Sequence, residues 1–477
     1  MLPGSPRYQP KALQRVFGYD ALYGAVGQVE LAVMAELGEM GVIPKEHMAL
    51  LTPEVVRRVL AIRTTDVDKV EREVTKHDVR AWVRLAQEIL PSELRLWVHV
   101  PLTSYDVLDT ARILQFKQAH RDVLSPRLEK VCHIFADLIE RHARTLQIGR
   151  THGQHALPIT VGFWLATVAQ RFNTNAIAMA RAERQLVGKI SGAVGAYNAQ
   201  VGLGFTDPKN HHERSFEERV LRRLDLEPAL ASTQILPPEP LAHYLFACVA
   251  TSASLGQFGR DSRHLMRSEI GEVCEEFEQG QVGSSTMAHK RNPVNFEQIE
   301  GMWLRNRSEL GKVTDLLVSD HQRDLVGSSI LRDLPIIVVN LTVQLETLLR
   351  EGGKDKKPFL ARIGIDTVAC ARNFNASKHL VLAEPIYIAL QMAGYAGDAH
   401  ELVNRVAVPL AQGDGRMLME VVESLAESEA TLHDALGRIP EEVRALLKDP
   451  SQYIGDAIER SLATAERLRN YAGNVRF

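Results

Sequence analysis

Apolar residues recur at intervals of three and four along most of this chain, which is the spacing of one face of an α-helix. One such series consists of Leu128, Val131, Phe135, Leu138 and His142. A longer series extends over residues 241–273, and another begins at Pro158, a suitable first helical residue, and continues to about Leu186. The sequence contains no alternating apolar series typical of β-strands and no internal repeat. The pattern therefore predicts an all-α protein.

The lengths of these helices predict a bundle, because long helices need apolar partners on more than one face. Pro335 opens a further helix, which is expected to end at the loop-like cluster EGGKDKKP at 351–358. An earlier loop-like segment, PLTS at 101–104, gives way to continuous helix near Thr110. We therefore predict three helical domains, residues 1–110, 111–363 and 364–477, of which the central one is a bundle of long helices.

Composition narrows the class of protein. The chain has 477 residues, of which 24% are charged, and a formal net charge of −3, so no basic field favours binding to nucleic acid or to an anionic membrane. We see no apolar run of about 18 residues, the length that a membrane-spanning helix needs. The four cysteines are far apart, which favours reduced thiols over disulfides or a zinc site. With no signal-peptide core at the N-terminus, we expect a cytoplasmic protein.

The segment GSSTMAHKRNP at 283–293 is the first candidate for chemistry. Gly283 frees the backbone, Ser284 and Ser285 offer hydroxyl and N–H groups, and Lys290 adds a positive charge. Such a loop could hold a carboxylate and place a hydroxyl beside an acidic C–H bond, as a lyase that abstracts a proton requires. The alternative is a surface turn with solvated basic residues.

Two further segments could take part in catalysis or binding. GRTHGQH at 149–155 places His152 and His155 three residues apart at an expected loop-to-helix junction, where a histidine can act as a general acid or base. A metal pair is the less favoured alternative, since no carboxylate or cysteine lies nearby in the sequence. A histidine within the core is the default for either residue alone. In PLTSYD at 101–106, Thr103 and Ser104 could bind an anion or cap a helix.

These segments together resemble a known family. GSSTMAHKRNP resembles the GSSxMPxKxNP signature of the fumarase/aspartase superfamily of lyases, although Ala288 stands where that family usually has proline. GRTHGQHA is similar to the second signature of its adenylosuccinate lyase branch. Further similar segments are Arg7-Tyr8, Lys76-His77-Asp78-Val79, Ser232-Thr233-Gln234, QRD at 322–324, SSILR at 328–332 and GKISGAVG at 188–195. The last is not a P-loop, because it lacks the required earlier glycine.

The resemblance implies an enzyme that eliminates fumarate from adenylosuccinate to give AMP, and from the succinyl-carboxamide ribotide SAICAR to give AICAR. In that reaction Ser284 would be the general base and His152 the general acid. Glu297 would orient His152, Lys290 would stabilise the carbanion, and His77 would bind substrate and assist proton transfer. No metal or organic cofactor is expected. The resemblance also implies a homotetramer, in which the central helices of four chains form one bundle and each active site draws on three subunits.

The substrate is expected to be a small phosphorylated succinyl-nucleotide. The residues that the resemblance assigns to its binding are Arg7, Tyr8, Lys76, His77, Asp78, Thr103, Ser104, Gln234, Ser285, Lys290, Asn292, Arg323, Ser328 and Arg332. The roles of Tyr105, Arg150, His289 and Arg291 stay open, and each arginine taken alone could be an ordinary solvated charge.

Two other functions remain as alternatives. One is another lyase of the superfamily, or an enzyme like 3-carboxymuconate cycloisomerase, whose substrate has no phosphate and would not need Arg7 and Tyr8. The other is a non-enzymatic bundle that retains the fold. A purely structural protein has no need to keep Ser284, His152, Lys290, Asn292 and Glu297 together, which weighs against it.

Overall fold

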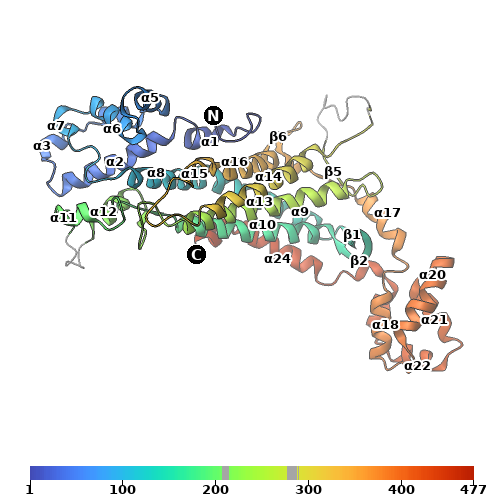
Figure 1. Cartoon of the computed structure of the whole chain (residues 1–477). Coiled ribbons are helices and arrows are strands. Elements are labelled where there is room, and N and C mark those ends of the chain that lie inside the picture. Colours follow the sequence, from blue (N-terminus) through green and yellow to red (C-terminus); the bar gives the residue numbers. More distant parts are fainter. Residues whose placement is uncertain (207–213, 277–286, 288, 477) are drawn as a thin grey trace.

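The computed structural model describes residues 1–206, 214–276, 287 and 289–476. Figure 1 shows long helices lying side by side in the centre of an elongated molecule. The N-terminal helices cover one end, and a smaller group of helices projects from the other. The predicted all-α class is confirmed, because helices account for most of the described chain and the strands are short.

The central bundle explains the predicted helical series. Its helices are α9 (Ser125–His142), α10 (Val161–Arg184), α13 (Glu239–Leu265), α14 (Val294–Asp315), α16 (Pro335–Leu349) and α24 (Ala457–Arg469). Edge-on aromatic contacts join three of them, since the Phe258 ring centroid lies 5.3 Å from that of Phe135 and 5.9 Å from that of Phe296. These rings are excluded from water, so their burial stabilises the bundle as well as fixing how its helices pack.

The N-terminal helices lead directly into this bundle. They are α1 (Lys11–Phe17), α2 (Leu22–Glu39), α3 (Lys45–Met48), α4 (Pro53–Leu60), α5 (Thr64–Val70), the π-helical turn η1 (Glu71–Thr75), α6 (Asp78–Ile89), α7 (Ser92–Arg95) and α8 (Ser104–Ala119). A π-helical turn, η2 (His120–Leu124), connects α8 to α9. Residues 104–142 are therefore one continuous helical run. The division expected at residue 110 falls inside α8, and the division into three domains stays a prediction.

The C-terminal part contains a second apolar core. After α17 (Thr367–Ser377), residues 380–453, here called the C-terminal unit, pack around their own buried residues. The helices of this unit are α18 (Ala383–Met392), α19 (Ala399–Glu401), η4 (Leu402–Ala407), α20 (Val408–Asp414), α21 (Leu418–Ala426), α22 (Ala430–Arg438), α23 (Glu441–Lys448) and η5 (Pro450–Gln452). The chain then returns to the bundle, where Ala465 and Leu468 of α24, and Tyr471 of α25 (Tyr471–Arg476), join the main core.

The sequence pattern missed a β-hairpin. Strands β1 (Leu146–Thr151) and β2 (Gln154–Thr160) pair antiparallel, and Pro158 lies opposite Ile148 within them. The expectation that Pro158 opens a helix is therefore wrong. Helix α10 begins three residues later, where the Thr160 hydroxyl accepts a hydrogen bond from the Phe163 N–H at 3.1 Å. This side-chain cap satisfies an N–H group at the helix start, which a proline cannot do.

Other short strands and turns connect the helices. Strand β5 (Val273–Cys274) pairs with β8 (Gly364–Ile365), so the apolar series expected to continue to Val273 ends as a helix at Leu265. The remaining strands are β3 (Val187–Gly188), β4 (Glu227–Pro228), β6 (Glu351–Gly352) and β7 (Lys357–Pro358). The remaining helices are α11 (Asn198–Gly202), α12 (Phe216–Arg223), α15 (Ser328–Asp333) and the 3₁₀ turn η3 (Phe359–Arg362).

One helical segment is long and apolar enough to cross a membrane by length and composition. It covers the 22 residues Ser328–Leu349, and 61% of its apolar window is buried inside the protein. Its α16 portion packs between α9, α13 and α14, which is the position of a core helix. The four cysteines are free thiols.

Candidate active site

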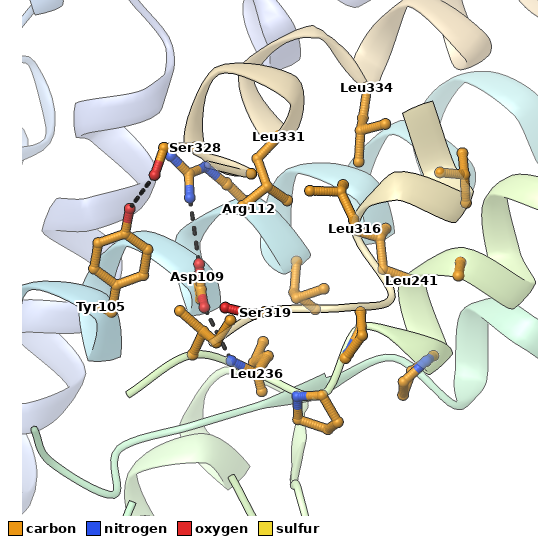
Figure 2. A pocket seen from close by; sticks show the side chains of 18 of the residues that line it. Tyr105, Asp109, Arg112, Leu236, Leu241, Leu316, Ser319, Ser328, Leu331 and Leu334 are labelled. Carbon is orange, nitrogen blue, oxygen red and sulfur yellow. Dashed lines mark hydrogen bonds and ion pairs between the residues drawn. The ribbon is translucent and has the colours of Figure 1, made fainter. Parts of the chain in front are cut away.

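A cluster around Tyr105 unites three predicted substrate contacts. Tyr105 is the second residue of α8, and the guanidinium carbon of Arg323 lies 3.3 Å from the centroid of its ring. Arg323 also donates a hydrogen bond from Nη1 to Oε1 of Gln234 at 2.9 Å. The hydroxyl of Tyr105 lies 3.3 Å from that of Ser328 (Figure 2). The cation–π contact and the hydrogen bond hold Arg323 in one orientation, and Tyr105, whose role the sequence left open, is its support.

The turn that carries Thr103 and Ser104 is stabilised by the buried ion pair of Asp106 and Lys189. Thr103 caps α8, and its N–H donates to Oδ2 of Asp106 at 2.9 Å. The other oxygen of Asp106 accepts from Lys189 Nζ at 2.5 Å and from the Gly192 N–H at 3.1 Å. The side chains of Lys189 and Asp106 are 0% and 1% exposed. Capping, the simpler role considered for Thr103, is confirmed.

The segment GKISGAVG at 188–195 therefore has a structural role within a single chain. Lys189 is not its only contact, because the Ser191 hydroxyl lies 2.6 Å from the hydroxyl of Ser232, which is two residues before Gln234. The Ile190 N–H donates to Glu217 Oε1 at 2.6 Å. This buried turn thus joins the start of α8 to the segment that carries Gln234.

A pocket opens beside the Tyr105 cluster (Figure 2). Its empty space is about 880 Å³, part of which is open solvent. The wall is mostly apolar and comes from α8, the segment 235–238, the start of α13 and the stretch 313–334. Asp109 lies in this wall and accepts from Arg112 Nη1 at 3.3 Å and from the Leu236 N–H at 3.0 Å. Burial raises the pKa of the Asp109 carboxyl, and the positive charge of Arg112 opposes that rise.

A second group lies where α6 begins. His77 is the N-cap residue, and its Nδ1 accepts a long hydrogen bond of 3.5 Å from the Arg80 N–H. Asp78 lies 3.3 Å from the same nitrogen, and its other oxygen is 4.0 Å from Arg332 Nη2. Lys76 is exposed and has a positive φ of 54°. The structure thus brings Asp78 of α6 close to Arg332 of α15.

His152 lies at the tip of the β1–β2 hairpin, not at a loop-to-helix junction as expected. It is exposed and has a φ of 54°, and Gly153 beside it has a φ of 78°. This left-handed pair makes the tight turn between the strands. Arg150, which pairs with His155 near the tip, anchors the hairpin through two hydrogen bonds to Glu272, at 2.7 and 3.1 Å. The nearby His155 donates to or accepts from the Ser377 hydroxyl at 2.8 Å, and burial lowers its pKa.

The signature segment is described only in part. Ser284, Ser285 and Ala288 lie outside the described residues. Lys290 and His289 are exposed, and the Lys290 N–H donates to the Met287 carbonyl at 3.0 Å. Asn292 is half-buried, and Glu297 is exposed in the first turn of α14. Among described residues, no group of three or more His, Cys, Asp or Glu side chains is arranged to hold a metal ion.

Arg7 and Tyr8 lie in a separate groove before α1. The guanidinium of Arg305 lies over the Tyr8 ring, 5.3 Å from its centroid. Arg7 is exposed, and the groove is also lined by Arg127 of α9 and Arg350. Arg127 and Arg350 were not among the residues predicted from the sequence.

In a single chain the predicted site residues occupy opposite halves of the molecule. Figure 1 places hairpin β1–β2 and strand β5 beside α17, whereas α6, α8 and α15 lie toward the other half. The candidate acid His152 is therefore remote from the cluster of Tyr105, Gln234 and Arg323. Sequence reasoning also missed two buried carboxylates, Glu272 and Glu275, which flank β5. The acidic residues of the EVCE segment just before the signature were the available signal.

Comparison with known proteins places this architecture in a family. The family model described as "Lyase" matches residues 16–305. An adenylosuccinate lyase of Archaeoglobus fulgidus is 30% identical, over 98% of this chain and 98% of that protein. The Bacillus subtilis adenylosuccinate lyase is 33% identical, over 80% of this chain and 83% of its own.

Solved structures share the fold at lower identity. The crystal structure of a fumarate lyase from Mesorhizobium sp. BNC1 has a TM-score of 0.78 at 22% identity, covering 98% of this chain and 100% of that one. The 3-carboxy-cis,cis-muconate lactonizing enzyme from Pseudomonas putida has a TM-score of 0.75 at 22% identity, with 98% of both chains covered. The chain therefore belongs to the adenylosuccinate lyase family of the fumarase/aspartase superfamily, and it is a C–N lyase.

Proposed function

We propose that this protein eliminates fumarate from adenylosuccinate to give AMP, and from SAICAR to give AICAR, as a cytoplasmic enzyme of purine nucleotide biosynthesis. The observation that carries the proposal is the match to adenylosuccinate lyases over nearly the whole of both chains. The Tyr105 cluster supports it, because a guanidinium fixed by a ring and an amide suits an anionic nucleotide.

The reaction needs a base, an acid and a means of stabilising a carbanion. The base removes a proton from Cβ of the succinyl group, the electrons of that bond form the double bond of fumarate, and the C–N bond breaks. The acid then protonates the departing nitrogen, so that one proton leaves the substrate and one is returned to it. Elimination of this kind requires that negative charge on the neighbouring carboxylate be stabilised as it develops.

We assign the base to Ser284 and the acid to His152. A serine hydroxyl is a weak base, so its ionised form must be favoured by a nearby positive charge, which Lys290 provides in the same segment. Lys290 and Asn292 would also bind the carboxylate on which charge accumulates. Glu297 would orient the imidazole of His152 and favour its protonated form.

The remaining assigned residues bind the nucleotide. Arg323 and Ser328 would hold phosphate and ribose, with Gln234 beside them. Arg332 would add a second guanidinium. The other residues assigned to binding the substrate are Arg7, Tyr8, Lys76, His77, Asp78, Thr103, Ser104 and Ser285. A phosphate held by several arginines is bound far more strongly than by one, because each adds charge-assisted hydrogen bonds.

The site would be completed only in an assembly. We propose a homotetramer in which the hairpin of one chain meets the Tyr105 cluster of another. The separation of β1–β2 from α8 and α15 within one chain supports this arrangement (Figure 1). Closed symmetric assembly would then give every site the same composition.

The test is direct conversion of substrate. Purified protein is incubated with adenylosuccinate, and AMP and fumarate are followed by chromatography; a parallel reaction uses SAICAR. Equimolar AMP and fumarate are expected, with the Ser284→Ala variant as the inactive control. Absence of either product at high enzyme concentration would refute the proposal. Lactonisation of 3-carboxymuconate by the same preparation would instead favour the cycloisomerase alternative.

A further inference from the structure

Glu272 is the most heavily bonded buried carboxylate in the described structure near the candidate site. Its side chain is 0% exposed. It accepts from Gln147 Nε2 at 2.7 Å, from both terminal nitrogens of Arg150 at 3.1 and 2.7 Å, and from Asn373 Nδ2 at 2.8 Å. Two of these partners belong to strand β1 and the third to α17, so one side chain joins the His152 hairpin to the start of the C-terminal part.

The backbone of Glu272 extends the same junction. Its N–H donates to the carbonyl of Leu265 at the end of α13, at 3.0 Å. Its carbonyl accepts from the N–H of Asp366, the N-cap residue of α17, also at 3.0 Å. Three structural elements, β1, α13 and α17, therefore meet at this residue, and Arg150 supplies the charge that compensates a carboxylate buried away from water.

Glu275 makes a matching junction three residues later, on the other side of β5. It is 3% exposed. Its Oε1 accepts from the backbone N–H groups of Asn295 at 2.8 Å and Phe296 at 3.0 Å, and its Oε2 accepts from the Asn295 side chain at 2.7 Å. These N–H groups open α14, where a negative charge interacts favourably with the helix dipole. Glu275 thus fixes the start of the helix that carries Glu297.

We propose that Glu272 and Glu275 are positioning residues for the elimination reaction. Glu272 holds the His152 hairpin in place through Arg150 and Gln147. Glu275 holds the segment of Lys290, Asn292 and Glu297 in place through the first turn of α14. The two carboxylates thus fix both segments on either side of β5. The proposal rests on the proposed function, because it presumes that His152 and Lys290 take part in the chemistry. Neither carboxylate has to touch substrate for this role.

The competing explanation is that these carboxylates only stabilise the fold. A matched control exists within the bundle, since Glu300 of α14 is also a buried carboxylate held by arginines. Its oxygens lie 2.8 Å from Arg260 and 3.1 Å from Arg263, both on α13. Glu300 links two helices of the bundle, and these ion pairs involve neither the His152 hairpin nor the first turn of α14. Loss of its charge should therefore destabilise the protein without moving the candidate catalytic groups.

The experiment compares Glu272→Gln, Glu275→Gln and Glu300→Gln in the full-length protein. In the first two variants an amide N–H replaces an acceptor oxygen and faces groups that are themselves donors, so the junction cannot keep its geometry. With adenylosuccinate, kcat should fall by about 10²-fold, the scale of a displacement near 1 Å, with KM changed much less. Hydrogen exchange of the hairpin, residues 146–160, should become faster in Glu272→Gln. Glu300→Gln should keep kcat and the exchange of the hairpin.

A milder variant covers the case in which Glu272→Gln does not fold. Gln147→Leu removes one donor to Glu272 and also removes Oε1 of Gln147, a buried atom that lacks a hydrogen-bond partner among the described residues. Its fold should survive, while hairpin exchange still rises and kcat falls by about tenfold, equivalent to about 1.4 kcal/mol in the barrier.

Two results would overturn the proposal: unchanged kcat and hairpin exchange in Gln147→Leu and the Glu272 variant, or equal loss of kcat in Glu300→Gln. A wild-type protein that does not act on adenylosuccinate would refute the proposed function instead. Hairpin exchange would still decide whether Glu272 fixes the hairpin.

Discussion

Lys189 Nζ lies 2.5 Å from Asp106 Oδ1, and both side chains are excluded from water. Two ions buried this deeply stabilise each other only while both are present, because a single remaining charge keeps its full desolvation cost. The pair also lies directly beneath the Thr103 cap, since the second oxygen of Asp106 accepts from the Thr103 N–H. It therefore joins the stability of the fold to the geometry of a proposed anion-binding turn.

Lys189→Met should lower the free energy of unfolding by about 3–5 kcal/mol, because it leaves Asp106 buried without its cation. Thermal and urea unfolding measure the change. The double variant Lys189→Met/Asp106→Asn should recover part of this loss, because no uncompensated charge remains. If the double variant is no more stable than Lys189→Met, the ion pair is not the cause.

Arg323→Lys should weaken substrate binding. A lysine ammonium cannot both lie flat on the Tyr105 ring and donate in the direction of Gln234, as the planar guanidinium does. We expect KM for adenylosuccinate to rise by about tenfold, which corresponds to about 1.4 kcal/mol, with a smaller change in kcat. Steady-state kinetics measure both constants.

Arg307→Lys is the matched control for that substitution. Arg307 also lies over an aromatic ring, 5.8 Å from the centroid of Trp303, but it is exposed on α14 and has no proposed role in binding. Its KM should equal that of the wild type. A similar rise in KM in both variants would mean that Arg323 has no specific role in binding.

Ser284→Ala and His152→Ala should each lower kcat by roughly 10²–10⁴-fold, the usual contribution of one proton-transfer residue. Neither change should unfold the protein, because His152 is exposed at the tip of its hairpin, and far-ultraviolet circular dichroism checks this. Near-normal turnover in either variant would remove that residue from its assigned role.

Mixing these two inactive variants tests whether active sites are shared between chains. If His152 and Ser284 of one site come from different subunits, random reassembly at equal amounts should restore both residues in about one quarter of sites. Activity should therefore return after the variants are dissociated and reassembled together, and a tag on one variant confirms mixed assemblies. Mixed assemblies that stay inactive would place both residues of a site on one chain.

His120 should make stability depend on pH. Burial lowers its pKa from 6.5 to about 4, with Arg121 and Arg184 adding to the shift. The unfolded chain therefore binds this proton at higher pH than the folded one. The resulting stabilisation, roughly 3 kcal/mol at 1.36 kcal/mol per pKa unit, is fully present above pH 6.5 and is lost as the pH falls through about 4.

His120→Gln should remove this part of the pH dependence. Urea unfolding at pH 7 and pH 4.5 measures the loss of stability in each variant, and the loss should be smaller in His120→Gln than in the wild type. His433→Gln, which changes an exposed histidine of α22, should behave as the wild type does. Equal losses in all three proteins would contradict the assignment to His120.

The long helices were predictable because their apolar positions repeat over many turns. The hairpin of β1 and β2 was not predictable, since its strands are short. The sequence around Pro158 also does not distinguish a proline within a strand from a proline at the start of a helix. What distinguishes the two cases is the Thr160 cap, whose hydrogen bond to Phe163 depends on where the chain has already been placed. Val273 was misassigned for a similar reason, because its strand partner Ile365 lies far away in the sequence.

The candidate site was also predictable only in part, because some of its contacts join residues far apart in the sequence. The resemblance pointed to Gln234, Arg323 and Ser328, which the structure does bring together around Tyr105. It gave no indication of Glu272 or Glu275, whose importance arises from partners more than a hundred and about twenty positions away, respectively. Pairings over such separations depend on the fold, so the acidic EVCE segment alone does not reveal what these carboxylates bind.

The C-terminal unit is connected to the bundle by two neighbouring attachments, α17 on the way in and α24 on the way out. A rigid body that is held at two points can rotate only about the line that joins those points. Such a body has one rotational freedom where a singly tethered one has three. Any swing of the unit would pull on α17, and through Asn373 the strain would reach Glu272 and the hairpin that carries His152.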